Sequence, residues 1–448
     1  MTIPTLIAAV LAAPVALADP CGMVPPVWTG VGAEPTIERQ GLQQTYVFYR
    51  DGVQTIAIRP GFTGTVDEFG MLVPLPSAPA LRKIDDKTFT HLEAAVDPPR
   101  VEVHPYNASF AMDDSVSELA STRSTSKMAS AGLELRRDEV RVVNQEAVGM
   151  YEVAVLEAGS ADALSLWMAQ HDYAYPNGMD RVVEDYVHSG WLFAAIKARV
   201  GSGQDTHARP GMRGVDVAKP AGARFDGYVQ GMAFRFASPE PIVPMRLSTF
   251  NGSDTHNRVY MLADRPVRVV DVDGDLVRRQ VGGDDLLTNL LEPLPIRVHG
   301  DADSIGVDGW TQVEAVRDPT PYNGVARDLF ASDMLAVQQG SLSLPFEEHE
   351  KALLDVGESL GLRGAAIDQL VLAVVDAARD EAVSSVVYAL EEMTLTVVDG
   401  ELPREHLQSE NLRFAGWTMP WWKNLESVWS LRPVGPTVWV PTDGGLAR

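Results

Sequence analysis

The chain has 448 residues, which is too long for one ordinary hydrophobic core, so two or three domains are expected. Its hydrophobic content of 45% is typical of a globular protein and excludes disorder throughout the chain. The 61 acidic residues outnumber the 37 basic ones, and the formal net charge of −24 disfavours nucleic acid and anionic membrane surfaces as partners.

The N-terminus has the pattern of a secretory signal peptide, residues 1–18. Ile3 to Leu17 are mostly apolar or small, and Ala16-Leu17-Ala18 matches the small-x-small pattern before a cleavage point. No later stretch reaches the about 18 continuous apolar residues of a transmembrane helix. We therefore expect an extracytoplasmic protein, periplasmic or secreted. Cys21 is the only cysteine, so it stays a free thiol or pairs with another chain.

Residues 19–108 are expected to form an N-terminal β-rich domain. Asp51-Gly52 separates two alternating runs, which is the pattern of a tight hairpin turn with two positive φ angles. The predicted elements are strands at Gln43–Arg50, Val53–Arg59, Phe69–Pro76 and Val101–Tyr106, with a helix at Asp85–Ala95. The prolines in the third of these strands, Phe69–Pro76, indicate an edge strand or a strand end.

Residues 109–140 are rich in serine and threonine and are expected to be a flexible connector. The following central α+β domain, 141–280, begins with a β-α-α-β unit between Val148 and Val200. Ser160 is the expected N-cap of its first helix, and Gly190 is expected to end the second helix. Four more strands are predicted, at Tyr228–Phe236, Met245–Phe250, Val259–Ala263 and Val267–Val272.

Residues 281–345 show no clear period and are assigned as an irregular connector. From Phe346 the period becomes helical: leucines mark one helix at 353–360, and an apolar stripe marks a second at 367–378. We read that stripe as a packed core face, with a partner-binding helix as the alternative. The region 346–448 also holds five of the nine tryptophans: Trp417, Trp421, Trp422, Trp429 and Trp439. They either bury a seam between this region and the sheet, the preferred interpretation, or form an aromatic platform for sugar rings or a peptide.

Two blocks resemble a bacterial family, the domain of unknown function 2330. The first runs from Cys21-Gly22 through the hairpin to Asp67–Pro76, followed by Lys87–Leu92 and Pro98. The second comprises Trp167–Tyr173, Tyr186 and Gly190–Phe193. The resemblance covers roughly residues 20–270 and implies an exported bacterial protein with no established activity. The chain lacks the second cysteine that often follows the first in such proteins, which puts a paired-cysteine role in doubt.

No nucleophile elbow, phosphate-binding loop or dinucleotide-binding glycine pattern is found in the sequence. The nine histidines are scattered, no zinc-binding pattern occurs, and no cofactor or metal is expected. Two aspartate-rich turns, 271–275 and 301–308, partly match calcium loops. Glycine and glutamine occupy their twelfth positions, so ordinary turns explain them better.

The candidate ligand-binding residues are Trp167, His171, Tyr173 and Trp191. On a helix, Trp167 and His171 are i and i+4 neighbours and are expected to stack; a half-buried aromatic cluster at a helix end is the competing interpretation. The sequence predicts an α+β fold with an N-terminal antiparallel or mixed sheet domain, a central β-α-α-β unit on a sheet and a helical C-terminal region. It favours a non-catalytic envelope or periplasmic protein that binds or scaffolds an envelope protein or glycan. The alternative is a hydrolase of an unfamiliar type that uses His171 or His256 on an envelope substrate.

Overall fold

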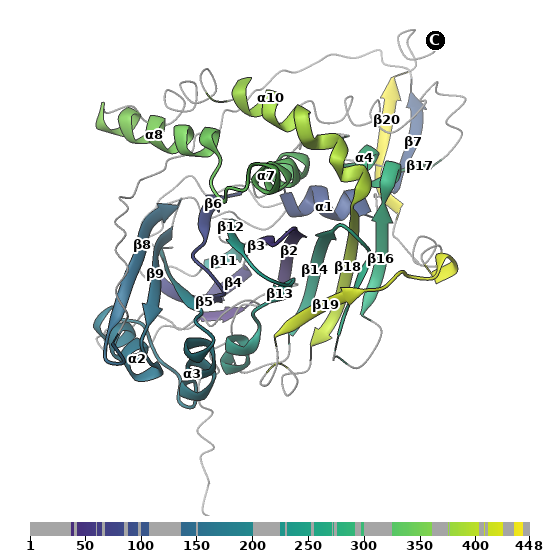
Figure 1. Cartoon of the computed structure of the whole chain (residues 1–448). Coiled ribbons are helices and arrows are strands. Elements are labelled where there is room, and N and C mark those ends of the chain that lie inside the picture. Colours follow the sequence, from purple (N-terminus) through teal and green to yellow (C-terminus); the bar gives the residue numbers. More distant parts are fainter. Residues whose placement is uncertain are drawn as a thin grey trace, which may run out of the picture.

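The structure is a computed structural model of the chain, shown in Figure 1. It describes residues 37–39, 43–59, 61–64, 68–84, 88–96, 100–106, 136–148, 151–199, 225–228, 231–251, 255–270, 272, 276–291, 297–299, 325–360, 375, 377–402, 407, 411–423 and 434–441. The fold is α+β, as predicted, because helices cover mixed and antiparallel sheets without regular β-α-β alternation.

A seven-stranded sheet forms the centre of the molecule, in the order β16-β18-β14-β2-β3-β12-β6. The predicted hairpin is confirmed, since β2 and β3 pair antiparallel and Asp51 and Gly52 have φ angles of 50° and 79°. The β2–β14 pair is parallel and the other pairs are antiparallel. The strands are β2 (Gln43–Arg50), β3 (Val53–Ile58), β6 (Ala80–Lys83), β12 (Met232–Ala237), β14 (Thr255–Ala263), β16 (Val277–Gly282) and β18 (Thr394–Leu402).

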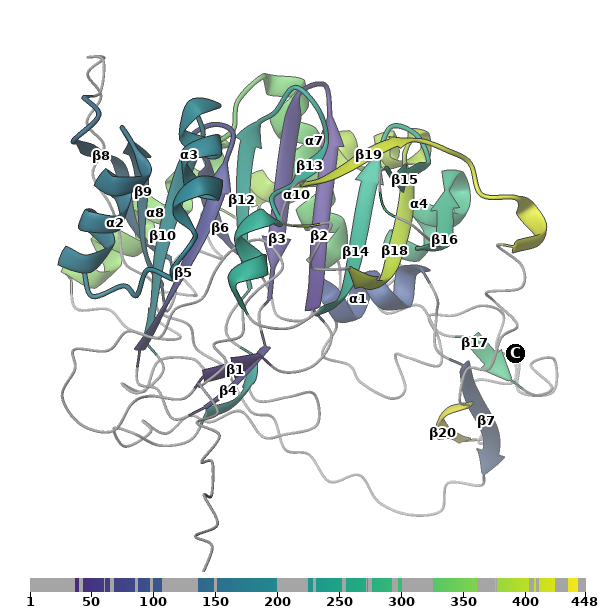
Figure 2. The same ribbon diagram turned by 90° about the horizontal axis from the view of Figure 1, so that it is seen from below.

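A second, antiparallel sheet has the order β5-β10-β9-β8 and lies beside the β6 edge of the first (Figure 2). It contains the predicted β-α-α-β unit: β9 (Tyr151–Ala158), α2 (Ala161–Gln170), α3 (Asp180–His188) and β10 (Leu192–Arg199). Ser160 caps α2 by accepting a hydrogen bond from the Ala163 amide, and Gly190 has a φ of 73° just beyond α3. The other strands are β8 (Val140–Val148) and the edge strand β5 (Glu68–Leu75), whose edge position agrees with its proline, Pro74.

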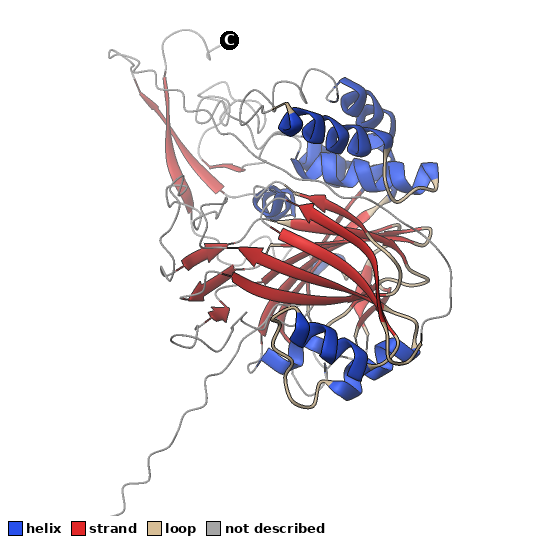
Figure 3. Cartoon of the chain, turned by 90° about the vertical axis from the view of Figure 1, so that its left-hand side faces the viewer, coloured by secondary structure: helices blue, strands red, loops and turns tan. Residues whose placement is uncertain are grey.

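The sheets and helices form layers (Figure 3), and three hydrophobic cores lie between them. One face of each large sheet contributes to a shared core that includes Val47, Met71 and Phe234. The opposite face of the seven-stranded sheet is covered by helices around Phe330. The opposite face of the four-stranded sheet is covered by α2 and α3 around Leu164. The helices on the seven-stranded sheet include α1 (Thr88–Val96), α4 (Gly283–Leu291), α7 (Val325–Gln339), α10 (Ala377–Val386) and η3 (Val387–Glu392).

Several smaller elements complete the described part of the chain. Three small sheets have the orders β1-β4-β11, β13-β19-β15 and β17-β7-β20. Their strands are β1 (Ile37–Arg39), β4 (Gly61–Gly64), β11 (Phe225–Tyr228), β13 (Ile242–Val243), β15 (Val267–Val269), β19 (Leu412–Gly416), β7 (Arg100–Tyr106), β17 (Arg297–His299) and β20 (Val434–Pro441), and the remaining helices are η1 (Arg246–Asn251) and α8 (Pro345–Ser359).

Two predicted strands differ from the structure. The run 228–236 belongs to two strands in separate sheets, β11 and β12. The predicted strand Met245–Phe250 was wrong: η1 is a 3₁₀ helix there. The hydroxyls of Ser248 and Thr249 donate to the carbonyls three residues earlier, which closes tight turns that compete with an extended backbone.

The seven-stranded sheet crosses the domain boundaries expected from the sequence. The seven-stranded sheet takes β2 from the first expected domain, β14 from the second and β18 from the third, so the three segments share one sheet. The expected irregular connector 281–345 contains α4 and α7. Its helical period was hidden because buried polar residues interrupt the apolar stripe of α7. The apolar stripe 367–378 lies mostly outside the described residues.

In the described ranges, no helix has both the length and the apolar character needed to cross a membrane.

Candidate functional site

Three of the four predicted binding residues form one cluster at the end of α2, which we call the aromatic shelf: Trp167, His171 and Tyr173. The Trp167 and His171 rings stack with centroids 3.9 Å apart, and the Tyr173 ring lies 5.9 Å from Trp167. Lys197 Nζ lies 5.4 Å from the centroid of the Tyr173 ring and donates to the carbonyl of His171. The predicted i, i+4 stacking is thus confirmed.

The end of α2 fixes this arrangement. Asp172 has a φ of 66°, in the left-handed region that aspartate tolerates better than most residues. The Tyr173 amide then donates back to the carbonyl of Met168 over 2.9 Å, the bond of a Schellman motif. The chain therefore folds back at the helix end, and the Tyr173 ring returns beside Trp167.

Glycine at position 70 makes room for the shelf on the four-stranded sheet. Gly70 on β5 pairs with Lys197 on β10, and a Cβ atom at this position would lie 2.4 Å from Cδ1 of Tyr173. The tyrosine ring therefore lies directly on the backbone of the sheet, where it is buried. Trp167 is half-buried above it and His171 is exposed, so the shelf offers an edge to solvent on a rigid base.

Trp191, the fourth predicted residue, packs elsewhere. Its ring lies 4.8 Å from Tyr186 of α3, whose hydroxyl bonds to Oδ1 of Asn411. Arg246 of η1 lies over the Tyr186 ring, with its Cζ atom 5.6 Å from the ring centroid. Trp191 thus helps to pack α3 against η1 and the strand region near 411.

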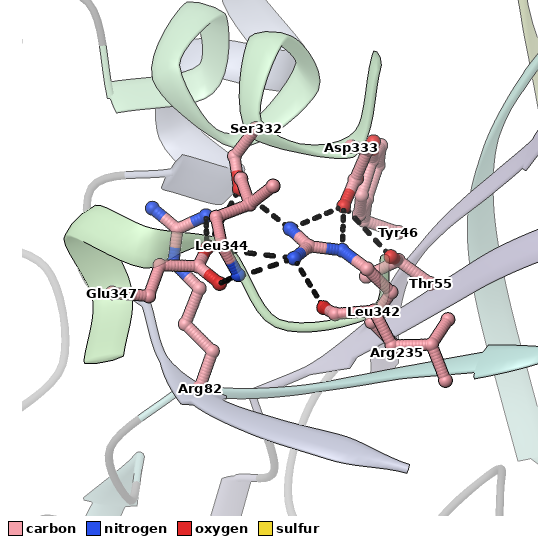
Figure 4. Close-up of polar contacts among 9 residues, drawn as sticks. All are labelled: Tyr46, Thr55, Arg82, Arg235, Ser332, Asp333, Leu342, Leu344 and Glu347. Atoms are coloured by element: carbon pink, nitrogen blue, oxygen red, sulfur yellow. Dashed lines mark hydrogen bonds and ion pairs between the residues drawn. The ribbon is translucent and has the colours of Figure 1, made fainter. Parts of the chain in front are cut away.

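A buried ion cluster, which the sequence analysis missed, joins the seven-stranded sheet to α7 and α8 (Figure 4). Arg235 on β12 is its centre, with a side chain 5% exposed. Its guanidinium group donates to Asp333, Ser332, the Leu342 carbonyl and Glu347. The sequence signal was an arginine between Phe234 and Phe236 in an otherwise apolar strand.

Asp333 on α7 is completely buried and is bonded from three directions. Tyr46 Oη and Thr55 Oγ1 each donate to it over 2.7 Å, and Arg235 Nε donates over 3.0 Å. Burial and the adjacent Asp333 carboxylate raise the pKa of Tyr46 well above its ordinary value, so this hydroxyl remains a donor.

Glu347 on α8 completes the cluster. It accepts from Ser332 Oγ over 2.8 Å and from the Leu344 amide over 3.2 Å, and Arg82 Nη1 lies 3.3 Å from it. Burial opposes its ionisation, but Arg235 and Arg82 offset this effect and lower its pKa. Two guanidinium groups thus face two carboxylates, and the cluster acts as a closed structural clamp.

His256 makes the contact most relevant to catalysis. Its Nε2 lies 2.5 Å from Oδ1 of Asp399 on β18, and its side chain is 51% exposed. Arg258 bonds both Asp399 and Glu93, which forms a charged chain from β18 to α1. Burial raises the pKa of Asp399, but hydrogen bonds from Arg258 and His256 more than offset this and lower it. A carboxylate held ionised beside a histidine can orient that ring through their hydrogen bond.

Among the residues that the structure describes, no three His, Cys, Asp or Glu side chains are grouped to hold a metal ion. Both aspartate-rich turns lie almost entirely outside the described ranges, so calcium binding there stays a hypothesis.

Comparison with curated proteins and with solved structures gave no match. A comparison with protein families did give one, over residues 27–309, which include the hairpin, the aromatic shelf and the strands that carry Arg235 and His256. The match covers more than half of the chain and agrees with the resemblance seen in the sequence. The chain therefore belongs to the family described as uncharacterized protein conserved in bacteria, DUF2330.

Proposed function

We propose that this chain is an exported, non-catalytic protein of the bacterial cell envelope that binds or scaffolds an envelope component through the aromatic shelf. The observation that carries the proposal is the construction of the shelf. The Trp167 and His171 rings stack with centroids 3.9 Å apart, and Trp167 also stacks on Tyr173, whose ring lies against the backbone at Gly70. Rigid aromatic surfaces give large contact area with little loss of side-chain entropy on binding.

The buried ion cluster supports a binding role over a catalytic one, because its charged groups pair with one another. Arg235, Asp333 and Glu347 satisfy one another inside a closed cluster, so their charges stabilise the fold and are not turned toward a substrate. At the shelf, His171 Nδ1 is bonded to the Trp167 carbonyl over 2.8 Å. This contact holds the ring in its stacked position and leaves the outer edge of the imidazole available to a ligand.

Binding is tested on arrays that carry bacterial envelope glycans and envelope-protein peptides, with the whole mature chain as the probe. We expect retention that is lost in His171→Ala and Trp167→Ala. The matched control is His188→Ala, because His188 is also exposed and its Nδ1 also bonds the carbonyl four residues earlier at 2.8 Å. Equal retention by His171→Ala and His188→Ala, or no retention by the wild type, overturns the proposal.

Export is tested separately by fractionation of cells that express the chain. The motivation is the apolar run that ends at Ala16-Leu17-Ala18. We expect an extracytoplasmic product whose N-terminus is Asp19, and Ala18→Asp is expected to leave the precursor uncleaved. A cytoplasmic product with an intact Met1 contradicts the localisation.

A hydrolase remains the second candidate, motivated by the His256–Asp399 pair at 2.5 Å. A histidine oriented by a carboxylate is the usual form of a general base. Turnover of ester, glycoside or peptide substrates that disappears in His256→Ala and survives in His171→Ala would establish this candidate. If the wild type turns over none of the three substrate classes, the hydrolase candidate is rejected.

A further inference from the structure

Trp421 and Trp422 expose their side chains beyond β19. They are 74% and 51% exposed, respectively, whereas the nearby Trp417 is packed partly against the shared core. The preferred expectation from the sequence, that these tryptophans bury a seam, therefore fits Trp417 and is wrong for Trp421 and Trp422. Trp429 lies outside the described residues, as do the side-chain surroundings of Trp439.

The segment that carries the pair, 417–423, is held rigidly at its base. Gln280 on β16 is buried, and its side-chain amide accepts from the Met419 amide over 2.7 Å and donates to the Trp417 carbonyl over 3.0 Å. The Trp417 amide donates to the Pro266 carbonyl, and the Met419 side chain is buried in the shared core. The two exposed indoles thus stand on a fixed support, which reduces the entropy lost when a ligand binds.

The exposed area of the pair is small. A tryptophan side chain offers about 250 Å² at most, so these two leave roughly 300 Å² of aromatic surface in solvent. A stable protein interface needs about 800 Å² on each partner. None of the other large exposed hydrophobic residues in the described ranges lies on this segment. They are Val142 on β8, Leu166 on α2, Val356 on α8, Leu360 just after α8 and Tyr388 on η3. The area fits one or two sugar rings better than a second copy of the chain.

Trp421 and Trp422 occupy successive positions of the helical turn 421–423. Successive residues of a helical turn point about 100° apart, so the two indoles present separate faces to a chain-like ligand.

We propose that Trp421 and Trp422 form a carbohydrate-binding site for a polysaccharide. The indole faces pack against the C–H faces of pyranose rings. This site is independent of the aromatic shelf, because the two lie on different elements and share no residue.

The test is affinity electrophoresis of the whole mature chain in native gels that contain polygalacturonate (acidic) or dextran (neutral). We expect at least one of the two polysaccharides to retard the chain. Trp421→Ala and Trp422→Ala are each expected to weaken binding about tenfold, because each removes one aromatic contact with a sugar ring.

Tyr388→Ala is the matched control, because Tyr388 is an exposed aromatic residue on another element, η3. The proposal is overturned if neither polysaccharide retards the wild type. It is also overturned if the tyrosine variant and the tryptophan variants lose the same amount of binding. Two further results also overturn it: tryptophan-dependent binding to phosphatidylcholine vesicles with no polysaccharide binding, and tryptophan-dependent dimerisation in sedimentation.

Discussion

Arg235 Nε on β12 donates to Oδ1 of Asp333 on α7 over 3.0 Å, between residues 98 positions apart in the sequence. Both side chains are buried, at 5% and 0% exposure. This bond connects the central sheet to the helical layer that covers it. Buried ion pairs are costly to desolvate, so removal of one partner has a larger effect than removal of both.

We expect Asp333→Ala to lower the free energy of unfolding by about 3–5 kcal/mol, because it leaves the Arg235 charge buried and poorly compensated. Urea denaturation measures the change. Asp185→Ala is the control: it breaks an exposed pair with Arg246 and should cost at most about 1 kcal/mol. The double variant Arg235→Met/Asp333→Leu should be more stable than Asp333→Ala. Equal losses in Asp333→Ala and Asp185→Ala contradict the clamp.

Glu347 gives the ion cluster a pH dependence. Its pKa in the folded chain lies below the ordinary value of 4.5, so the folded state binds fewer protons there than the unfolded state does. The stabilisation by Glu347 is therefore present above pH 4.5 and is lost as the pH falls through the lower folded pKa. In thermal melts from pH 7 to 3, Glu347→Gln should flatten this acid-side loss. Glu348→Gln, a change at an exposed neighbour, should lose stability with falling pH as the wild type does. If Glu347→Gln also loses stability between pH 7 and 3 as the wild type does, Glu347 is not the source of the pH dependence.

Gly70→Ala should disturb the aromatic shelf, because the new methyl group would lie 2.4 Å from the Tyr173 ring. We expect a loss of about 1–3 kcal/mol in unfolding free energy, the usual cost of overpacking. Gly416→Ala is the control, since a Cβ atom there meets Arg265 at an ordinary 3.5 Å. Combining Gly70→Ala with Tyr173→Ala should cost less than the sum of the two single changes; strict additivity shows that the contact is unimportant.

Gln280→Leu should loosen the segment that holds Trp421 and Trp422. It removes the acceptor of the Met419 amide and leaves buried backbone groups unpaired, which costs about 1–3 kcal/mol. Hydrogen exchange measured by NMR at the Met419 amide should become faster, while exchange at the Tyr173 amide in the shelf stays slow. Unchanged protection of Met419 means that another contact fixes the segment.

Local signals in the sequence predicted local structure well. Asp51-Gly52 predicted the hairpin, Ser160 and Gly190 predicted helix ends, and the i, i+4 spacing predicted the Trp167–His171 stack. Each depends on backbone conformation or spacing within a few residues, which the neighbouring residues determine directly. The fold class followed from the same signals, because strands and helices occur in separate runs.

Only the tertiary structure decided how distant segments meet. It joined three expected domains into one sheet, placed Trp191 against Tyr186, and brought Arg235 to Asp333 and Glu347. It also separated the tail tryptophans into the half-buried Trp417 and the exposed Trp421 and Trp422. The sequence by itself determined local features, namely the hairpin turn, the helix ends and the stack at the end of α2, but it did not predict η1, α4 or α7. Strand order and the pairing of buried charges depend on contacts between residues about a hundred or more positions apart, and no local period encodes these contacts.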